Sequence, residues 1–173
     1  MAVHDIDLTL WFFGDDTIPK SISAHGITAV QPELKKYNDY DNVVGIVEFH
    51  GGKIAYYYCS RMMAHGQEDT TEIIGTGDKL SVNANPQQNF VNHYHAGGIT
   101  REVPAQYYGR FEMAFVKESQ EFADACLDDT ELPIKLSNAV KAVEIGAALQ
   151  EALVSGQQIH FDEIGSRIEV SKL

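Results

Sequence analysis

The sequence has few of the features that mark secreted, membrane or nucleic-acid-binding proteins. Only two cysteines occur, Cys59 and Cys126, and we expect both to be free thiols in a reducing compartment. No apolar run reaches the roughly 18 residues of a membrane span, and no basic stretch precedes an apolar signal sequence. Because 25 acidic residues outnumber 13 basic ones, the net charge is -12, which argues against a nucleic-acid partner. These absences favour a cytoplasmic protein that binds neutral or small polar ligands.

The last three residues qualify that expectation. Ser171, Lys172 and Leu173 spell the tripeptide that serves as a peroxisomal address in eukaryotes. In a bacterium the same residues carry no signal. The sequence therefore leaves two locations open, the cytoplasm or, for a eukaryotic source, the peroxisome.

The chain has the length and apolar content of one domain, residues 1–173, with a tail from about 157. Apolar residues at helical spacing predict a helix over residues 1–13 that ends at Gly14. Strand signals follow in an edge strand over 21–30, a loop over 31–42 and three hairpins turning at glycines, over 43–59, 70–83 and 90–103. Two helices come next, from Phe111 to about Asp129 and from a cap at Ser137 or Asn138 to Ser155, before a short strand over 158–161.

Three successive hairpins predict an antiparallel sheet, because parallel strands need long crossovers. The fold class is therefore α+β, a predominantly antiparallel sheet with helices packed on one face. Tyr56, Tyr57 and Tyr58 follow one another, so both faces of their strand carry aromatic rings. We expect the uncovered face to bind a partner, most simply a second copy of the chain.

Two groups of side chains could carry chemistry. His4 and Asp7 lie three positions apart on one helix face, and a histidine can take the proton released when a hydroxyl carbon is oxidised. The alternative is that His4 only hydrogen-bonds the start of its helix. The loop after the first hairpin carries a cation, an imidazole, an amide and a carboxylate, which suit the hydroxyls of a polyol: Arg61, His65, Gln67 and Glu68. A solvated loop is the alternative for this second group.

Other patterns argue against metal and nucleotide sites. His93 and His95 share a strand face but have no third ligand nearby in sequence, so a metal site is not expected. The glycine pairs lie in hairpin turns, whereas a dinucleotide fingerprint follows a strand and opens a helix. We therefore expect neither a Rossmann domain nor a bound nucleotide in this chain.

Four motifs in order resemble the C-terminal domain of the Gfo/Idh/MocA oxidoreductases, within them the inositol 2-dehydrogenase-like members, and the similarity covers nearly the whole chain. The opening His4-Asp5-Ile6-Asp7 with Leu10 and Trp11 is similar to the family's first helix. The later segments are similar to its strand and turn, its long helix and its closing helix: Glu72 to Leu80, Arg110 to Phe122 with Phe111, Ala114, Phe115 and Glu118, and Asn138 to Gly156.

The resemblance implies a dihydrodipicolinate-reductase-like fold and half of a two-domain enzyme. A Rossmann domain would bind NAD or NADP and contribute a lysine, while this half would contact the substrate and form oligomers through its sheet. His4 matches the histidine of the family's D-x-x-x-H motif, whose aspartate would fall before Met1. The resemblance therefore implies a fragment, inactive alone, whose parent oxidises a secondary hydroxyl of an inositol or sugar.

Two alternatives stay open. The chain could be a non-catalytic module that binds or assembles through its sheet, or the substrate could be an aldose or another polyol. The sequence does not distinguish NAD from NADP, because the resemblance places every residue that would do so upstream.

Overall fold

The structure is a computed structural model that describes residues 2–169. The peroxisome-like tripeptide Ser171 to Leu173 lies outside the described residues. The chain divides into two compact units, which are described separately below. The first unit comprises Met1–Met62 and Pro133–Leu173, and the second comprises Met63–Leu132.

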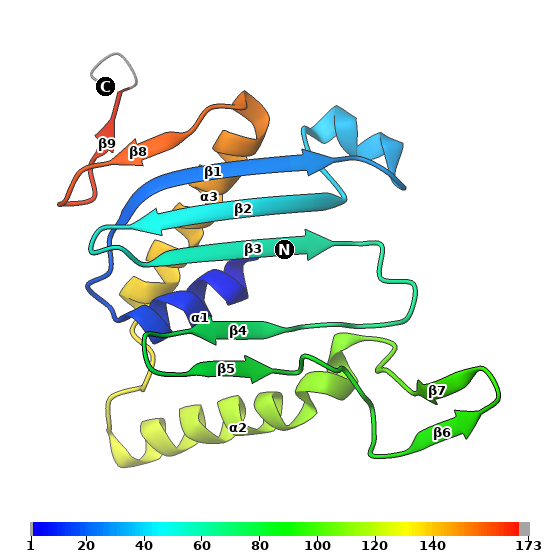
Figure 1. The fold of residues 1–173 in the computed structure, drawn as a ribbon. Coiled ribbons are helices and arrows are strands. Elements are labelled where there is room, and N and C mark those ends of the chain that lie inside the picture. The colour runs from blue at the N-terminus through cyan, green and yellow to red at the C-terminus, as the bar shows by residue number, and fades with distance from the viewer. Residues whose placement is uncertain (1, 170–173) are drawn as a thin grey trace. The chain divides into compact units, whose positions relative to one another are not determined.

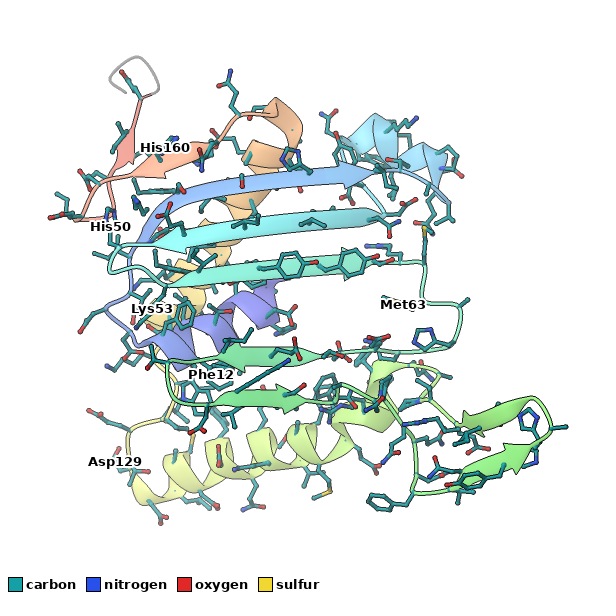
Figure 2. The ribbon with its side chains drawn as sticks, in the orientation of Figure 1. Phe12, His50, Lys53, Met63, Asp129 and His160 are labelled. Atoms are coloured by element: carbon teal, nitrogen blue, oxygen red, sulfur yellow. The ribbon has the colours of Figure 1, made fainter. Side chains whose placement is uncertain are left out.

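A five-stranded antiparallel sheet forms the first unit (Figure 1). Its order is β3-β2-β1-β8-β9, with the bounds β1 Pro19–Ile27, β2 Asn42–Phe49, β3 Ile54–Ser60, β8 Ile159–Phe161 and β9 Arg167–Ile168. The prediction of an edge strand over 21–30 was wrong, because β1 is the central strand. Its second neighbour, β8, pairs at Ser21 and Ile22 from far along the chain, and no local pattern reveals such a partner. His50, labelled in Figure 2, adds a contact to β8, because its Nε2 lies 3.1 Å from the Phe161 carbonyl oxygen.

Two helices cover one face of this sheet, α1 over Val3–Phe13 and α3 over Leu136–Ser155 (Figure 1). Helix α1 ends as predicted at Gly14, whose N–H donates to the Leu10 carbonyl. Apolar side chains of both helices and strands β1 to β3 form the core: Ile6, Leu10, Ile22, Ala24, Val47, Phe49, Ala55, Tyr57, Ala142, Ile145, Ala148, Leu149, Ala152 and Leu153. The predicted α+β class with an antiparallel sheet and helices on one face is confirmed.

Small residues on the covered face let α3 approach the sheet. A Cβ atom added to Gly45 would lie 2.7 Å from Leu149 Cδ2, so the leucine occupies the space that a side chain would fill. Along one register row, Gly45 stands between Ala24 and Tyr57. The close packing of α3 therefore depends on a glycine in the middle of β2.

The opposite face of the sheet is open and aromatic. Tyr57 is 7% exposed beneath the helices, whereas its neighbours Tyr56 and Tyr58 are 65% and 53% exposed. Ile46 pairs with Tyr56 in the register and is 43% exposed on the same face. The expectation that each face of β3 carries an aromatic ring is confirmed.

The predicted cap of α3 was wrong. The residue before the helix is Lys135, and neither Ser137 nor Asn138 caps it. Asn138 instead donates from Nδ2 to Asp15 Oδ1 at 2.7 Å, while Lys135 Nζ contacts Asp15 Oδ2 at 2.8 Å. These side-chain hydrogen bonds, with the positive charge of Lys135, hold the pKa of Asp15 below its ordinary value. The start of α3 is thus tied to the turn after α1. Its end at Gly156, with φ 68°, is as predicted.

A buried carboxylate organises the start of β2. Asp41 is fully buried, and its oxygens accept the backbone N–H groups of Ala29, Val30 and Gln31 and the Asn42 amide. Burial opposes ionisation, but these donors outweigh it and hold the pKa of Asp41 well below its usual range. The segment between β1 and β2, expected as a loop, contains a 3-10 helix over Pro32–Tyr37.

The second unit contains two hairpins and a long helix: β4 Thr71–Ile74 with β5 Lys79–Val82, β6 Asn92–His95 with β7 Gly98–Arg101, and α2 Tyr107–Asp128. The hairpins form where predicted, but within residues 2–169 they are separate two-stranded sheets and do not extend the five-stranded one. Helix α2 begins four residues before the predicted Phe111, where the backbone departs from helical geometry at φ -111° and ψ 15°.

Candidate functional site

His4 and Asp7 lie on α1 in the first unit. His4 is exposed in the first helical turn, and Asp7 is half-buried. The residue before the helix is Ala2, which makes no side-chain cap, and the structure records no partner for His4 among residues 2–169. The imidazole is therefore accessible to a ligand, and the alternative of a helix-capping histidine finds no support in the described residues.

Arg61 also belongs to the first unit, at the end of β3. Its backbone N–H donates to the Asp41 carbonyl at 2.9 Å, and its side chain is exposed. Beside it, Ser60 Oγ donates to Asn42 Oδ1 at 2.6 Å, and Asn42 Nδ2 contacts Met62 Sδ at 2.8 Å. The backbone of Arg61 is thus held by the buried Asp41 network while the guanidinium stays free to bind.

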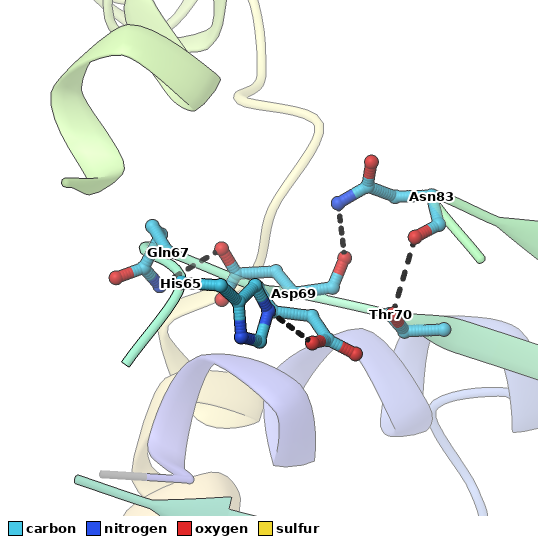
Figure 3. A network of polar contacts seen from close by, with 6 residues as sticks. His65, Gln67, Asp69, Thr70 and Asn83 are labelled. Carbon is cyan, nitrogen blue, oxygen red and sulfur yellow. Dashed lines mark hydrogen bonds and ion pairs between the residues drawn. The ribbon is translucent and has the colours of Figure 1, made fainter. Parts of the chain in front are cut away.

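The other predicted residues lie together in the second unit, in a loop that we call the binding loop, residues 65–69 (Figure 3). His65 Nε2 lies 2.9 Å from Glu68 Oε2, an ion pair when the imidazole is protonated. Gln67 Nε2 donates to Asp69 Oδ2 at 3.0 Å. The structure therefore brings His65, Gln67 and Glu68 into one loop, whereas it describes Arg61 and α1 in the other unit.

Asn83 and Thr70, which the sequence analysis did not single out, help to fix this loop. Asn83, just after β5, donates from Nδ2 to the Asp69 carbonyl at 2.8 Å, and its own carbonyl accepts from Thr70 Oγ1 at 3.2 Å (Figure 3). Asn83 has φ 57°, a left-handed conformation in which asparagine is enriched. The asparagine at the end of a strand was the available signal, but its partner lies 14 residues away and could not be read from spacing.

The backbone of the binding loop is also held. Gln67 N–H donates to the Pro104 carbonyl oxygen at 2.7 Å. Gly66 has φ 126°, and a Cβ there would lie 2.6 Å from the same oxygen. Only glycine fits this position without displacing the backbone, so the backbone of the loop is fixed by its own contacts.

A cavity of about 490 Å³ lies in the first unit between α1, α3 and strands β2 and β3. Ala2, Val3 and Ile6 line it from α1, and its walls are mainly apolar. Such walls cannot satisfy the many hydroxyls of a polyol. His4 and Asp7 do not line the cavity, so the candidate polar site is not this space.

Two groups on β3 face that cavity, and burial alters both. Burial raises the pKa of the Cys59 thiol, which makes the thiol a poor nucleophile. Burial also raises the pKa of Tyr57 to about 12. The Thr9 hydroxyl opposes that rise, but it donates to the Asp5 carbonyl at 2.8 Å, and no atom of residues 2–169 meets hydrogen-bond geometry with the Tyr57 hydroxyl. Both cysteines are free thiols, as expected.

Metal and membrane features are absent from the part of the chain that the structure describes. His93 and His95 share a face of β6 as predicted, with ring centroids 5.0 Å apart, but His95 Nδ1 accepts the Gly97 N–H. Residues 2–169 contain no group of three metal-ligating side chains. None of their helices is both long and apolar enough to cross a bilayer.

Comparisons with known proteins show what this chain is similar to. Residues 1–81 match the GFO/IDH/MocA C-terminal domain. The chain is 26% identical to scyllo-inositol 2-dehydrogenase (NAD(+)) of Bacillus subtilis over 93% of its own length and 46% of that protein. It is 24% identical to inositol 2-dehydrogenase of Rhizobium meliloti over 92% of its length and 48% of that protein.

Solved structures show the same similarity to inositol dehydrogenases. Scyllo-inositol dehydrogenase of Lactobacillus casei with bound NAD(H) and scyllo-inositol superposes with a TM-score of 0.86 at 28% identity, over 92% of this chain and 46% of that one. The chain is thus similar to the C-terminal domain of the Gfo/Idh/MocA proteins over residues 1–81 and to inositol dehydrogenases over most of its length. It spans about half the length of the relatives that it matches.

Proposed function

We propose that this chain is the substrate-binding domain of an NAD-dependent dehydrogenase that oxidises a secondary hydroxyl of an inositol or a related polyol. The observation that carries the proposal is the preorganised binding loop within a fold that superposes on inositol dehydrogenases. A polyol presents many hydroxyls that both donate and accept, and a loop with an imidazole, an amide and two carboxylates matches that chemistry.

The proposed roles follow from exposure and chemistry. His4, exposed at the start of α1, would accept the hydroxyl proton as the carbon becomes a ketone. The proposed hydroxyl-binding groups are Asp7 and Arg61 of the first unit and His65, Gln67 and Glu68 of the second, each unit taken by itself. The hydride would leave the same carbon for a nicotinamide, which accepts two electrons when bound. The glycine turns of the described chain connect hairpin strands, so the nicotinamide would be held by a separate nucleotide-binding domain.

Joining this chain to the NAD-binding half of the Bacillus subtilis relative tests the proposal. The joined protein should form NADH with an inositol, and His4→Ala should lower kcat by roughly 10²- to 10⁴-fold, the usual contribution of a proton-transfer group. His65→Ala should raise KM more than it lowers kcat. His93→Ala, on the β6–β7 hairpin, is the matched control and should change neither value.

The same experiment separates the alternatives. An unchanged kcat in His4→Ala would remove His4 from the chemistry and favour a module that only binds or assembles. Activity on simple sugars but not on inositols would keep the enzyme and change the substrate.

We also propose that a second copy of the chain covers the open sheet face. Tyr56, Tyr58, Ile46 and Ile54 are exposed on this face, and Ile54 pairs in the register with Glu48, which forms an ion pair with Lys20. Solvent-exposed apolar patches of this kind mark association surfaces. In an isologous contact, this patch on one copy of the chain would pack against the same patch on the other copy.

A further inference from the structure

The carboxylates in the binding loop determine which atoms of its other polar side chains remain available to a ligand. An ionised carboxylate can only accept hydrogen bonds. The side-chain atom of Gln67 that faces Asp69 at 3.0 Å must therefore be the amide nitrogen. Its carbonyl oxygen, Oε1, then points away from Asp69 (Figure 3). Gln67 is half-buried, and the structure records no partner for Oε1 among residues 2–169.

The same argument applies to His65. Its Nε2 faces the Glu68 carboxylate at 2.9 Å and must carry the hydrogen. The other ring nitrogen, Nδ1, is then a free acceptor while the imidazole is neutral. The loop therefore presents two hydrogen-bond acceptors, Gln67 Oε1 and His65 Nδ1.

The anchor of the loop is independent of these side-chain contacts. Asn83 bonds to the backbone carbonyl of Asp69, and Pro104 accepts the backbone N–H of Gln67. Removing the Asp69 carboxylate would leave both backbone contacts in place. The carboxylate thus has a separable role, which is to fix the direction of the Gln67 amide.

We infer that Asp69 is a positioning residue that turns Gln67 so that the loop selects ligands by their hydroxyl donors. The ligand class is a polyol whose hydroxyl hydrogens meet the two free acceptors. This inference rests on the proposed function, and it adds a residue and a selection rule that the proposed function does not contain.

Calorimetric titration of the 173-residue chain with scyllo-inositol tests it. In Asp69→Ala the Gln67 amide is free to rotate, so Kd should rise by about fivefold to tenfold, the effect of losing one oriented hydrogen bond. Asp69→Asn can still present an oxygen to Gln67, so its Kd should stay within about threefold of the native value. Asp78→Ala is the matched control, because it removes an acidic residue from the same unit and leaves the backbone bond of Asp78 to Gly75. Its Kd should not change.

A spectroscopic measurement separates positioning from a structural role. The side-chain NH₂ signals of Gln67 should lie away from those of free glutamine in the native chain and in Asp69→Asn, and should move to the free position in Asp69→Ala. If Asp69→Ala does not fold, Gln67→Met removes the acceptor directly and should raise Kd to the same extent.

The outcomes are distinct. Native affinity in both Asp69→Ala and Gln67→Met would overturn the positioning role and leave the proposed function intact. Equal losses in Asp69→Ala and Asp69→Asn would also overturn it, because charge and not orientation would then matter. A native chain that binds no scyllo-inositol would overturn the proposed function and this inference with it.

Discussion

Gly66 lies so close to Pro104 that a Cβ atom on it would be 2.6 Å from the proline carbonyl oxygen. Gly66→Ala would also place a side chain at φ 126°. We expect this variant to lose about 1–3 kcal/mol of unfolding free energy and to bind the polyol more weakly, because the backbone of the binding loop must move. Urea denaturation measures the first effect. Gly77→Ala, with no atom within 4 Å of its added Cβ, is the control. Equal stability of the two variants would contradict the account of this contact.

Tyr57 should make the stability of the fold depend on pH in the alkaline range. Its pKa is raised by burial to about 12, while the unfolded chain ionises near 10. The unfolded state therefore releases its proton first, so stability is intact below pH of about 10 and falls as the pH rises toward 12. The loss should approach about 2–3 kcal/mol, and Tyr57→Phe should lack it.

At neutral pH, Tyr57→Phe should be as stable as the native chain or more stable by up to about 1 kcal/mol, because the buried hydroxyl has no hydrogen-bond partner in the described part of the chain. Tyr56→Phe, whose ring is 65% exposed, is the control for unfolding measured at pH 8 and pH 11, values chosen on either side of roughly 10. A large loss of stability in Tyr57→Phe at neutral pH would show that the hydroxyl makes a bond that stabilises the fold.

Asp41 predicts the opposite dependence at acid pH. Its folded pKa is lowered, so its contribution is present above the unfolded value near 4 and is lost as the pH falls below that value. Asp41→Asn should lower Tm at neutral pH by more than about 5 °C, because an amide cannot accept from every donor that surrounds it. Thermal melts from neutral to acid pH should show a steep fall for the native chain and a shallow one for Asp41→Asn. Parallel curves would mean that Asp41 is not the group responsible.

The open sheet face predicts self-association. Tyr56→Lys places a charge in the centre of that face and should shift the mass measured by light scattering toward the monomer of 19.2 kDa. Tyr37→Lys is the control, since Tyr37 is 69% exposed and belongs to the 3-10 helix and not to a strand of the sheet. A monomeric native chain would remove the proposed interface.

Local signals predicted the elements well where turn chemistry decides the backbone. Gly51 and Gly52, both at φ 87°, close the β2–β3 hairpin as their pairing indicated. Long-range pairing could not be predicted, which is why β1 was expected at an edge although β8 joins it. The predicted cap of α3 was wrong for a similar reason, because Asn138 donates a hydrogen bond to Asp15, which lies 123 residues away in the sequence.

The candidate site shows the same difference between local signals and long-range contacts. The polar composition of residues 61–68 predicts a hydroxyl-binding loop, because the residue types alone suit hydroxyls. The contacts that orient the loop come from Asn83 and Pro104, which are distant in sequence and common in ordinary turns. Composition thus proposes the groups, whereas the fold determines which atoms those groups present.

Titration of the isotope-labelled chain with scyllo-inositol, followed by amide NMR, tests the central claim most directly. With ligand in the millimolar range, signals of His65, Gln67 and Glu68 should shift together with a single Kd, while those of the β6–β7 hairpin stay in place. Absence of shifts in the binding loop at saturating ligand, or shifts confined to other surfaces, would contradict the assignment of this chain as a polyol-binding domain.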